Sequence, residues 1–205
     1  MSDPRVLVAN RGEIALRVLQ SAHDLNINAV SIYCKSDRFA SHVLFSKGDS
    51  VEISGQGIAA YLNVPAILSA AQEFDCNLIH PGYGFLSESA DFAEQAEKAG
   101  ITWIGPTVSQ LRLFGNKLSA RAQAATVGLP ILGGSGVLRS LEDLESYIRK
   151  FPSNKSFVLK AVAGGGGRGI RVVDAETDLE SAFFLVSEEA TRSFGSGDVY
   201  LEEYF

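Results

Sequence analysis

Residues 157–173 constrain this chain more than any other stretch. An apolar, β-branched run ends on Lys160, a glycine-rich loop follows, and a second apolar run begins at residue 170. The loop contains four consecutive glycines, Gly164, Gly165, Gly166 and Gly167, followed by Arg168 and Gly169. Apolar runs on both sides of such a loop predict two strands joined as a hairpin. Glycines lack a Cβ, so their N–H groups can approach a ligand closely.

The cations of this segment favour a loop that covers phosphates. Lys160 supplies a compact positive charge at the entrance of the loop, and Arg168 supplies a fork of donors within it. It is not a Walker loop, because no G-K-[ST] follows and the loop leads into a strand. A flexible linker is the alternative, but linkers are normally flanked by polar sequence. The apolar flanks therefore favour the phosphate hairpin.

Composition excludes several classes of protein. The 205 residues carry a net charge of −6, with 46% hydrophobic and 20% charged residues. The proportions of hydrophobic and charged residues are those of an ordinary soluble globular protein. The negative net charge argues against nucleic acid and acidic membranes as partners. No apolar run approaches the roughly 18 residues that span a bilayer, and no signal peptide is evident. We expect a cytoplasmic protein, or a mitochondrial one if a transit peptide has been removed.

The cysteines and histidines indicate neither disulfides nor zinc. Cys34 and Cys76 lie beside apolar runs without a CxxC spacing, so buried free thiols are expected. The three histidines, His23, His42 and His80, lack a metal-ligand spacing.

Strand-like and helix-like segments alternate through the first half of the chain. Strands are expected at residues 5–9, 29–33, 50–53, 76–79 and 102–104. Helices are expected at residues 13–25, at 64–74 with Asn63 as cap, and up to residue 99 with Ser87 or Ser89 as cap. This alternation predicts an α/β fold with a Rossmann-like, doubly wound parallel sheet in residues 1–114. Loops 10–13 and 80–88 would wall a site at the carboxyl ends of the strands.

The pattern changes after Pro106. A helical stretch at residues 109–127, broken near Gly115 and Asn116, leads into a glycine-rich connector at 132–136 that we expect to act as a hinge. We assign residues 115–134 to a helical linker and 135–205 to a small antiparallel α+β lid. The lid would contain a capped helix from Ser140, the Lys160 hairpin, a helix at 177–193 and a strand at 199–205. Because the sequence stops within this last run, we expect the lid to be incomplete and the chain to be a fragment.

Several motifs together resemble a known family. They are V-A-N-R-G-E-I-A at residues 8–15, H-P-G-Y-G-F-L-S-E at 80–88, I-G-P at 104–106, G-N-K at 115–117, the glycines at 164–169, and L-E-E-Y-F at 201–205. In this order they are similar to the biotin carboxylase component of biotin-dependent carboxylases, in the ATP-grasp superfamily. The resemblance implies that ATP and bicarbonate form carboxyphosphate, which then carboxylates biotin on a carrier domain. It implies three partners: the remainder of the biotin carboxylase chain, a biotin carboxyl carrier domain and a carboxyltransferase domain.

The resemblance also implies site residues. The implied ATP-binding residues are Lys117, Lys160, Gly164, Gly165, Gly166, Gly167, Gly169, Glu202, Glu203 and Phe205. Within this set, both lysines contact ATP, with Lys160 on the α and β phosphates, and Glu202, Glu203 and Phe205 read the adenine. Tyr83 and Gly84 match the loop that lines the bicarbonate and biotin side. No catalytic residue and no metal ligand is assigned, because the family's Mg²⁺-binding carboxylates would lie beyond Phe205.

Other residues have structural interpretations. Arg168 is expected to support its loop, and His80 to form a structural hydrogen bond before Pro81. Glu88 either caps the next helix or touches substrate. Trp103 and the phenylalanines are expected in the core. The sequence departs from the family's V-P-G-[ST] at residues 132–135, where it reads L-G-G-S, and from its frequent Met at Ile170.

Three alternatives remain at this point. Another ATP-grasp ligase would share the glycine loop, although the segment at residues 80–88 argues against it. A dinucleotide-binding module would need a G-x-G-x-x-G after the first strand, which is missing. A non-catalytic ATP-binding module is the third. We expect no turnover from these 205 residues alone. The acceptor substrate is not encoded in this segment, and the oligomeric state is not readable from the sequence.

Overall fold

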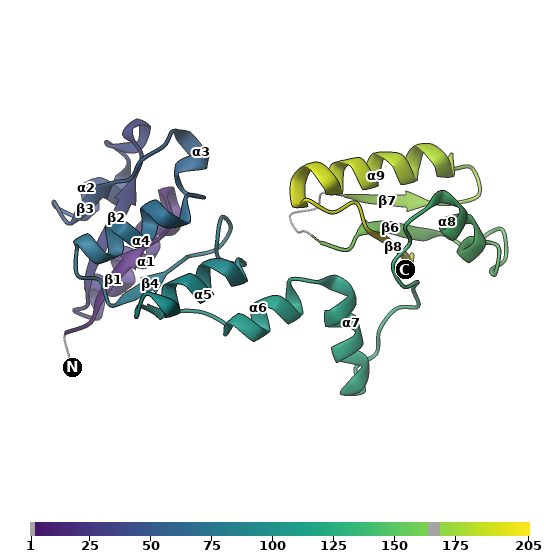
Figure 1. Ribbon diagram of the computed structural model, residues 1–205, viewed down its shortest axis with the longest axis horizontal. Coiled ribbons are helices and arrows are strands. Elements are labelled where there is room, and N and C mark those ends of the chain that lie inside the picture. Colours follow the sequence, from purple (N-terminus) through teal and green to yellow (C-terminus); the bar gives the residue numbers. More distant parts are fainter. Residues whose placement is uncertain (1–2, 164–168) are drawn as a thin grey trace. The chain divides into compact units, whose positions relative to one another are not determined.

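The computed structural model describes residues 3–163 and 169–205. The chain divides into two compact units, Met1–Leu111 and Arg112–Phe205. Figure 1 labels the helices and strands of both. In the described part of the chain, no helix combines the length and hydropathy needed to cross a membrane.

The first unit is built on a five-stranded parallel sheet in the order β3-β2-β1-β4-β5. Its strands are β1 (Arg5–Val8), β2 (Asn28–Tyr33), β3 (Ser50–Glu52), β4 (Leu78–His80) and β5 (Thr102–Trp103). Its helices are α1 (Gly12–Asp24), η1 (Lys35–Asp37), α2 (Ser41–Phe45), α3 (Gly57–Ala60), α4 (Val64–Glu73) and α5 (Ala90–Lys98). The predicted doubly wound parallel sheet is confirmed. The short segments η1, α2 and α3 were not predicted, because each is too brief to show a helical period.

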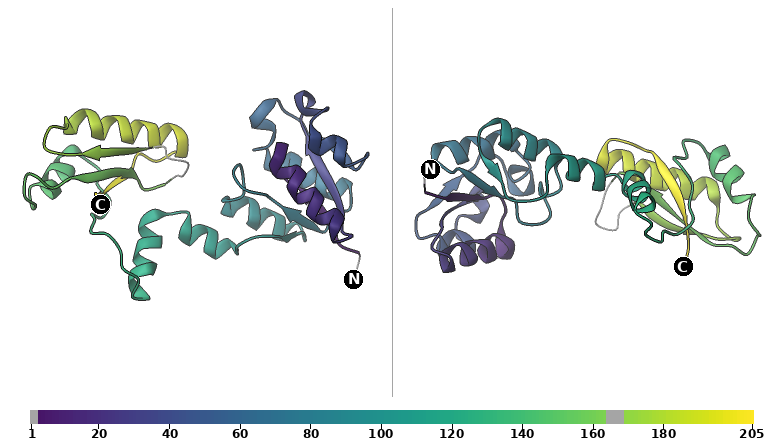
Figure 2. Two further views of the ribbon diagram at one scale, coloured as in Figure 1. Left: turned by 180° about the vertical axis from the view of Figure 1, so that it is seen from behind. Right: turned by 90° about the horizontal axis from the view of Figure 1, so that it is seen from below.

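Alternating residues of β1 pack into two separate hydrophobic clusters, one on each face of the sheet. Leu7 packs in a cluster with Ile67 of α4 and Phe92 of α5. Val6 belongs to a second cluster on the opposite face, together with Leu19 of α1. Accordingly α4 lies in front of the sheet in Figure 1, whereas α1 lies in front when the unit is seen from behind in Figure 2.

Two predicted helix caps are present in this unit. The Asn63 side chain accepts a hydrogen bond from the Ala66 N–H at 3.2 Å, and the Ser89 hydroxyl accepts one from Phe92 N–H at 3.2 Å. Ser89, not Ser87, therefore starts α5, and Glu88 is not its cap.

The second unit contains a three-stranded antiparallel sheet in the order β7-β6-β8. Its elements are α7 (Lys117–Thr126), α8 (Leu141–Ile148), β6 (Phe157–Ala161), β7 (Ile170–Val173), α9 (Leu179–Phe194) and β8 (Val199–Glu203). Helix α6 (Val108–Phe114) precedes α7, with the predicted break between them. The Lys160 hairpin is confirmed, and so is the capping box, in which Ser140 and Asp143 bond each other's backbone.

The connector before α8 is paired with the sheet instead of forming a hinge. Gly133 O accepts from Glu203 N–H at 2.8 Å, and Ser135 N–H donates to Leu201 O at 2.9 Å. Leu138 N–H donates to Val199 O at 2.8 Å. The expectation of a free glycine hinge at residues 132–136 is therefore wrong, because these bonds satisfy the otherwise open edge of β8.

The expectation that the phenylalanines are core residues holds only in part. Phe92 and Phe157 are fully buried, but Phe39, Phe114, Phe184 and Phe205 are exposed. In α9 the buried positions are Ala182, Val186 and Ala190, and Phe184 lies on the other face. The core-facing side of α9 is formed by smaller residues at helical spacing, so the position of Phe184 in the helical period places its side chain on the exposed side.

Candidate functional site

Lys160 and Glu202 share one face of the antiparallel sheet. In the register of β6 and β8, Lys160 pairs with Tyr200 and Val158 pairs with Glu202, so the two charged residues are diagonal neighbours. Lys160 Nζ donates to Glu202 Oε2, and only 24% and 12% of the two side chains are exposed. The predicted phosphate lysine is thus already bonded to the predicted adenine-reading carboxylate.

The second predicted lysine, Lys117, begins α7 and bonds the last residue of strand β6. Asn116 caps α7 by accepting from the N–H groups of Leu118 and Ser119, both at 3.0 Å, and it bridges to Ala163. Lys117 Nζ donates to Ala161 O at 3.1 Å. Lys117 therefore bonds the main chain of the residue that follows Lys160, and Lys160 in turn bonds Glu202.

Arg121 of α7 belongs to the same cluster and was not identified from the sequence. Its guanidinium donates through Nη1 to Glu202 Oε1 and through Nη2 to Leu132 O. It also lies 6.0 Å from the centroid of the Tyr200 ring. Its position four residues after Lys117, one helical turn along α7, was the available signal.

The remaining predicted ATP-binding residues differ in their surroundings. Glu203 Oε2 accepts from Lys155 Nζ at 2.9 Å. The Glu203 N–H donates to Gly133 O, which leaves the Glu203 carbonyl as the main-chain group that could contact adenine. Phe205 follows the end of β8 and is exposed. Gly169 has φ +63°, and a Cβ there would lie 2.9 Å from the Ala161 Cβ. Gly164, Gly165, Gly166, Gly167 and Arg168 lie outside the described residues.

In the first unit, Asn10 fixes the loop that carries Tyr83 and Gly84. Asn10 is fully buried, and its Nδ2 donates to Pro81 O at 2.7 Å and to Tyr83 O at 3.0 Å. Its Oδ1 accepts from the Arg11 N–H at 2.8 Å. The carboxyl ends of β1 and β4 are thereby joined, as expected for a residue that shapes a site.

Tyr83 itself is exposed, and His80 is structural. The Tyr83 hydroxyl donates to Glu13 Oε1 at 3.3 Å, and the Tyr83 side chain is 60% exposed. His80 Nδ1 accepts from the Gly82 N–H at 3.0 Å, so the ring proton resides on Nε2. Burial lowers the pKa of the His80 imidazole below its ordinary value. Gly84 has φ +70°, a conformation that favours glycine.

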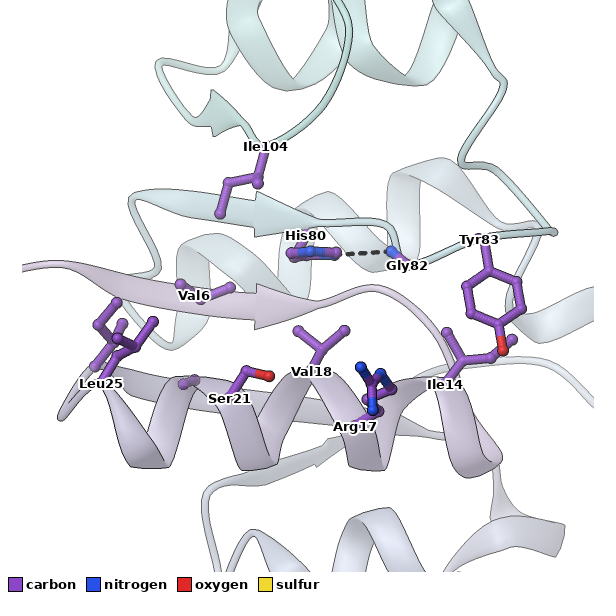
Figure 3. A pocket seen from close by; sticks show the side chains of 12 residues that line it. Val6, Ile14, Arg17, Val18, Ser21, Leu25, His80, Gly82, Tyr83 and Ile104 are labelled. Carbon is purple, nitrogen blue, oxygen red and sulfur yellow. Dashed lines mark hydrogen bonds between the residues drawn. The ribbon is translucent and has the colours of Figure 1, made fainter.

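A pocket of about 460 Å³ opens beside this loop. Figure 3 shows Ile14 and Val18 of α1, and Leu25 just after its end, facing Val6 and Ile104, with Tyr83 at one end. His80, Arg17 and Ser21 add polar atoms to a largely apolar wall. Such a wall suits an apolar group better than a polyphosphate.

A partly buried polar network at the ends of β1 and β2 was also missed by the sequence reasoning. Arg11 donates through Nε and Nη2 to the two oxygens of Asp37, at 2.6 and 2.7 Å. The Tyr61 hydroxyl donates to Asp37 Oδ2 at 2.7 Å and accepts from Cys34 N–H at 3.1 Å. The hydrogen bonds from Arg11 lower the pKa of Asp37, and burial raises the pKa of Tyr61. Because Arg11 and Asp37 follow adjacent parallel strands, their spacing was a usable signal.

The described residues hold no metal-ion site. Within residues 3–163 and 169–205, no three His, Cys, Asp or Glu side chains are grouped so as to hold an ion. Both cysteines are buried free thiols, as predicted.

Comparisons with known proteins match both parts of the chain. The family model "Biotin carboxylase, N-terminal domain" matches residues 2–111, and "Carbamoyl-phosphate synthase L chain, ATP binding domain" matches residues 116–205. Biotin carboxylase of Allochromatium vinosum is 42% identical over 202 residues, which are 98% of this chain and 44% of that protein. Pyruvate carboxylase of Bacillus subtilis is 40% identical over 203 residues, 97% of this chain and 17% of that protein.

Solved structures give the same result. The biotin carboxylase domain of Hydrogenobacter thermophilus 2-oxoglutarate carboxylase, in complex with MgADP, ADP and bicarbonate, has a TM-score of 0.93 at 38% identity. The match covers 100% of this chain and 45% of that one. Biotin carboxylase from Campylobacter jejuni has a TM-score of 0.92 at 38% identity, over 100% of this chain and 46% of that one. The chain thus spans less than half of these relatives, and it belongs to the biotin carboxylase family, whose N-terminal domain it contains.

Proposed function

We propose that these residues form the amino-terminal, nucleotide-binding part of a biotin carboxylase, an ATP-dependent ligase. In the whole enzyme, ATP and bicarbonate would give carboxyphosphate and ADP, and biotin on a carrier domain would then be carboxylated. The observation that carries the proposal is that Lys117 bonds the main chain at Ala161, the residue after Lys160, while Lys160 bonds Glu202 on the same sheet. The nucleotide and bicarbonate complex of the H. thermophilus relative supports it.

The cluster suits phosphoryl transfer, where catalysis consists of positioning and of neutralising charge. Lys160 would exchange Glu202 for the α and β phosphates, and Lys117 would reach ATP from the start of α7. Gly164, Gly165, Gly166, Gly167 and Gly169 would cover the terminal phosphates. Glu202, the carbonyl of Glu203 and Phe205 would read the adenine.

Tyr83 and Gly84 would line the bicarbonate and biotin side. The loop is fixed by Asn10, while the exposed Tyr83 ring remains open to a ligand. We assign no role to the apolar pocket next to Tyr83.

Magnesium is a part of the proposed activity that the described residues do not account for. No carboxylate cluster for it is found in residues 3–163 and 169–205, so we assign it no ligand here. For the same reason we expect these 205 residues to bind ATP without biotin-dependent turnover. Bicarbonate-dependent ADP release, measured with free biotin and Mg²⁺, should be absent. A rate of about 1 s⁻¹ or more would contradict this expectation.

The proposed organisation has three parts. Residues 1–114 form the N-terminal domain, 115–134 the helical linker and 135–205 part of the ATP-grasp lid. The remainder of a carboxylase chain, a biotin carboxyl carrier domain and a carboxyltransferase domain would be the partners. The match to pyruvate carboxylase, of which this chain covers 17%, supports partners of this kind.

Another ATP-grasp ligase is the second candidate for residues 116–205 alone, given their match to a carbamoyl-phosphate synthase domain. The match of residues 2–111 to biotin carboxylase favours the first candidate.

Calorimetric titration of the chain with ATP tests the proposal. Lys160→Ala should weaken binding by about 10-fold or more, because a charge-assisted contact is lost. Lys160→Arg should also weaken it, since a planar fork does not replace a compact ammonium. An exposed control, Lys98→Ala, should bind ATP normally. Equal binding by Lys160→Ala and the unaltered chain would overturn the assignment.

A further inference from the structure

Glu202 is held by two cations at once, one on each carboxylate oxygen. Arg121 bonds Oε1 and Lys160 bonds Oε2. The cluster of these three side chains, with one negative and two positive charges, therefore carries a net charge of +1. The Arg121 and Glu202 side chains are only 17% and 12% exposed, so water screens them weakly.

Arg121 is itself fixed from two further directions. Its Nη2 donates to Leu132 O, and its guanidinium lies over the Tyr200 ring. The backbone of Gly134 passes so close that a Cβ there would lie 3.0 Å from Arg121 Nη2 and 2.7 Å from Leu201 O. These contacts hold the Arg121 guanidinium in place independently of its bond to Glu202.

We infer that Arg121 is a positioning residue of the nucleotide site, which keeps Glu202 in place and charge-compensated when Lys160 leaves it for a phosphate. This inference rests on the proposed function, because it assumes that Lys160 binds nucleotide. Without Arg121, Lys160 would be the cation that neutralises Glu202. Its departure would then leave a poorly hydrated carboxylate near the phosphates, which disfavours binding.

A double-mutant cycle separates this role from a contact with phosphate. The variants are Arg121→Met, Glu202→Gln and their combination, with ATP and ADP titrated calorimetrically against the whole 205-residue chain. Arg121→Met should weaken binding about fivefold to tenfold, the effect of one partly screened charge. In the Glu202→Gln background, the same change should alter affinity less than about twofold, because the carboxylate that Arg121 compensates is gone.

Two further variants control for charge and fold. Arg121→Lys keeps a cation on Glu202 and should recover most of the affinity. Arg139→Met removes an exposed arginine of the same unit and should leave affinity unchanged. Urea midpoints of all variants report folding, and Arg121→Gln replaces Arg121→Met in the cycle if the latter does not fold.

The outcomes are distinct. Equal weakening by Arg121→Met in both backgrounds, or no weakening in either, overturns the inference while leaving Lys160 as a nucleotide ligand. If the unaltered chain binds no ATP, or if Lys160→Ala binds it normally, the proposed function fails and this inference fails with it.

Discussion

The two units use their polar residues in opposite ways. In Met1–Leu111, buried groups such as Asn10, Asp37 and Tyr61 bond to the backbone or to one another, and these bonds fix loops at the ends of parallel strands. In Arg112–Phe205, Lys117 donates to the main-chain carbonyl of Ala161 and Lys160 to the partly buried Glu202 carboxylate, both on a small sheet. A phosphate could replace those acceptors, whereas nothing could replace a buried Asp37 without loss of stability.

The difference teaches where to look for ligand binding in this chain. A buried polar network whose members are mutually satisfied stabilises one conformation. A lysine whose carboxylate partner keeps a second cation, as Glu202 keeps Arg121, can exchange that partner for another anion. We therefore expect substitutions in the polar network of the first unit to change stability, and substitutions of Lys117 and Lys160 in the second to change nucleotide affinity.

The largest effect on stability should come from Asp37→Ala. It removes the acceptor of Arg11 and of the buried Tyr61 hydroxyl, and should lower the free energy of unfolding by about 3 kcal/mol. Trp103, the chain's single tryptophan, is buried in the first unit, so its fluorescence in urea reports that unit. Asp24→Ala, in an exposed pair with His23, is the control and should change little. If the urea midpoint from Trp103 fluorescence were the same in Asp37→Ala as in the unaltered chain, the claim that polar residues of the first unit act in stability would be contradicted.

Acidification should destabilise the first unit selectively. Burial lowers the pKa of His42 and of His80, so the unfolded chain binds protons below its ordinary histidine pKa of about 6.5 while the folded unit does not. Stability should therefore fall as pH drops from 7 to 5, by about 1–2 kcal/mol for the two groups together. The same Trp103 transition measures it.

The second unit provides the comparison, because all three histidines lie in the first. Hydrogen bonds lower the pKa of Asp143 and Asp178 below the ordinary carboxyl value, so these groups cost stability only at more acidic pH. His23→Gln, at an exposed position, should leave the pH dependence intact. A Trp103 transition that does not move between pH 7 and 5 would show that burial of these histidines is not linked to folding.

The smallest effect should come from Ser140→Ala. It removes the N-cap of α8, where the Ser140 hydroxyl accepts from Asp143 N–H at 3.1 Å, and should cost about 1 kcal/mol. Circular dichroism in urea should show the loss in the second unit, with Ser153→Ala as an exposed control. If the Trp103 transition shifted by the same amount, the two units would unfold as one.

Much of the fold could be predicted because the spacing of hydrophobic residues indicates where the helices and strands lie. The parallel strands, the helices capped by Asn63 and Ser89, and the hairpin at Lys160 all follow from local sequence. The pairing of the connector with β8 could not be predicted, because residues 132–138 have no strand pattern and find their partner more than 60 positions away.

The candidate site could be predicted only as a set of residues. Motifs indicated Lys117, Lys160 and Glu202, but the bond between Lys160 and Glu202 depends on the register of β6 and β8. Arg121 was missed because it lies in no motif, and its role depends on the tertiary contact with Glu202. The same holds for the bonds among Arg11, Asp37 and Tyr61, which are brought together from three segments.

Hydrogen exchange with and without ATP tests the central claim most directly. Peptides covering residues 112–205 should become protected, most strongly at β6, at β8 and at the start of α7, and Lys160→Ala should abolish that protection. Peptides from residues 3–111 should exchange at the same rate in both conditions. Protection confined to residues 3–111, or protection of β6 and β8 that persists in Lys160→Ala, would contradict the assignment of ATP binding to the second unit.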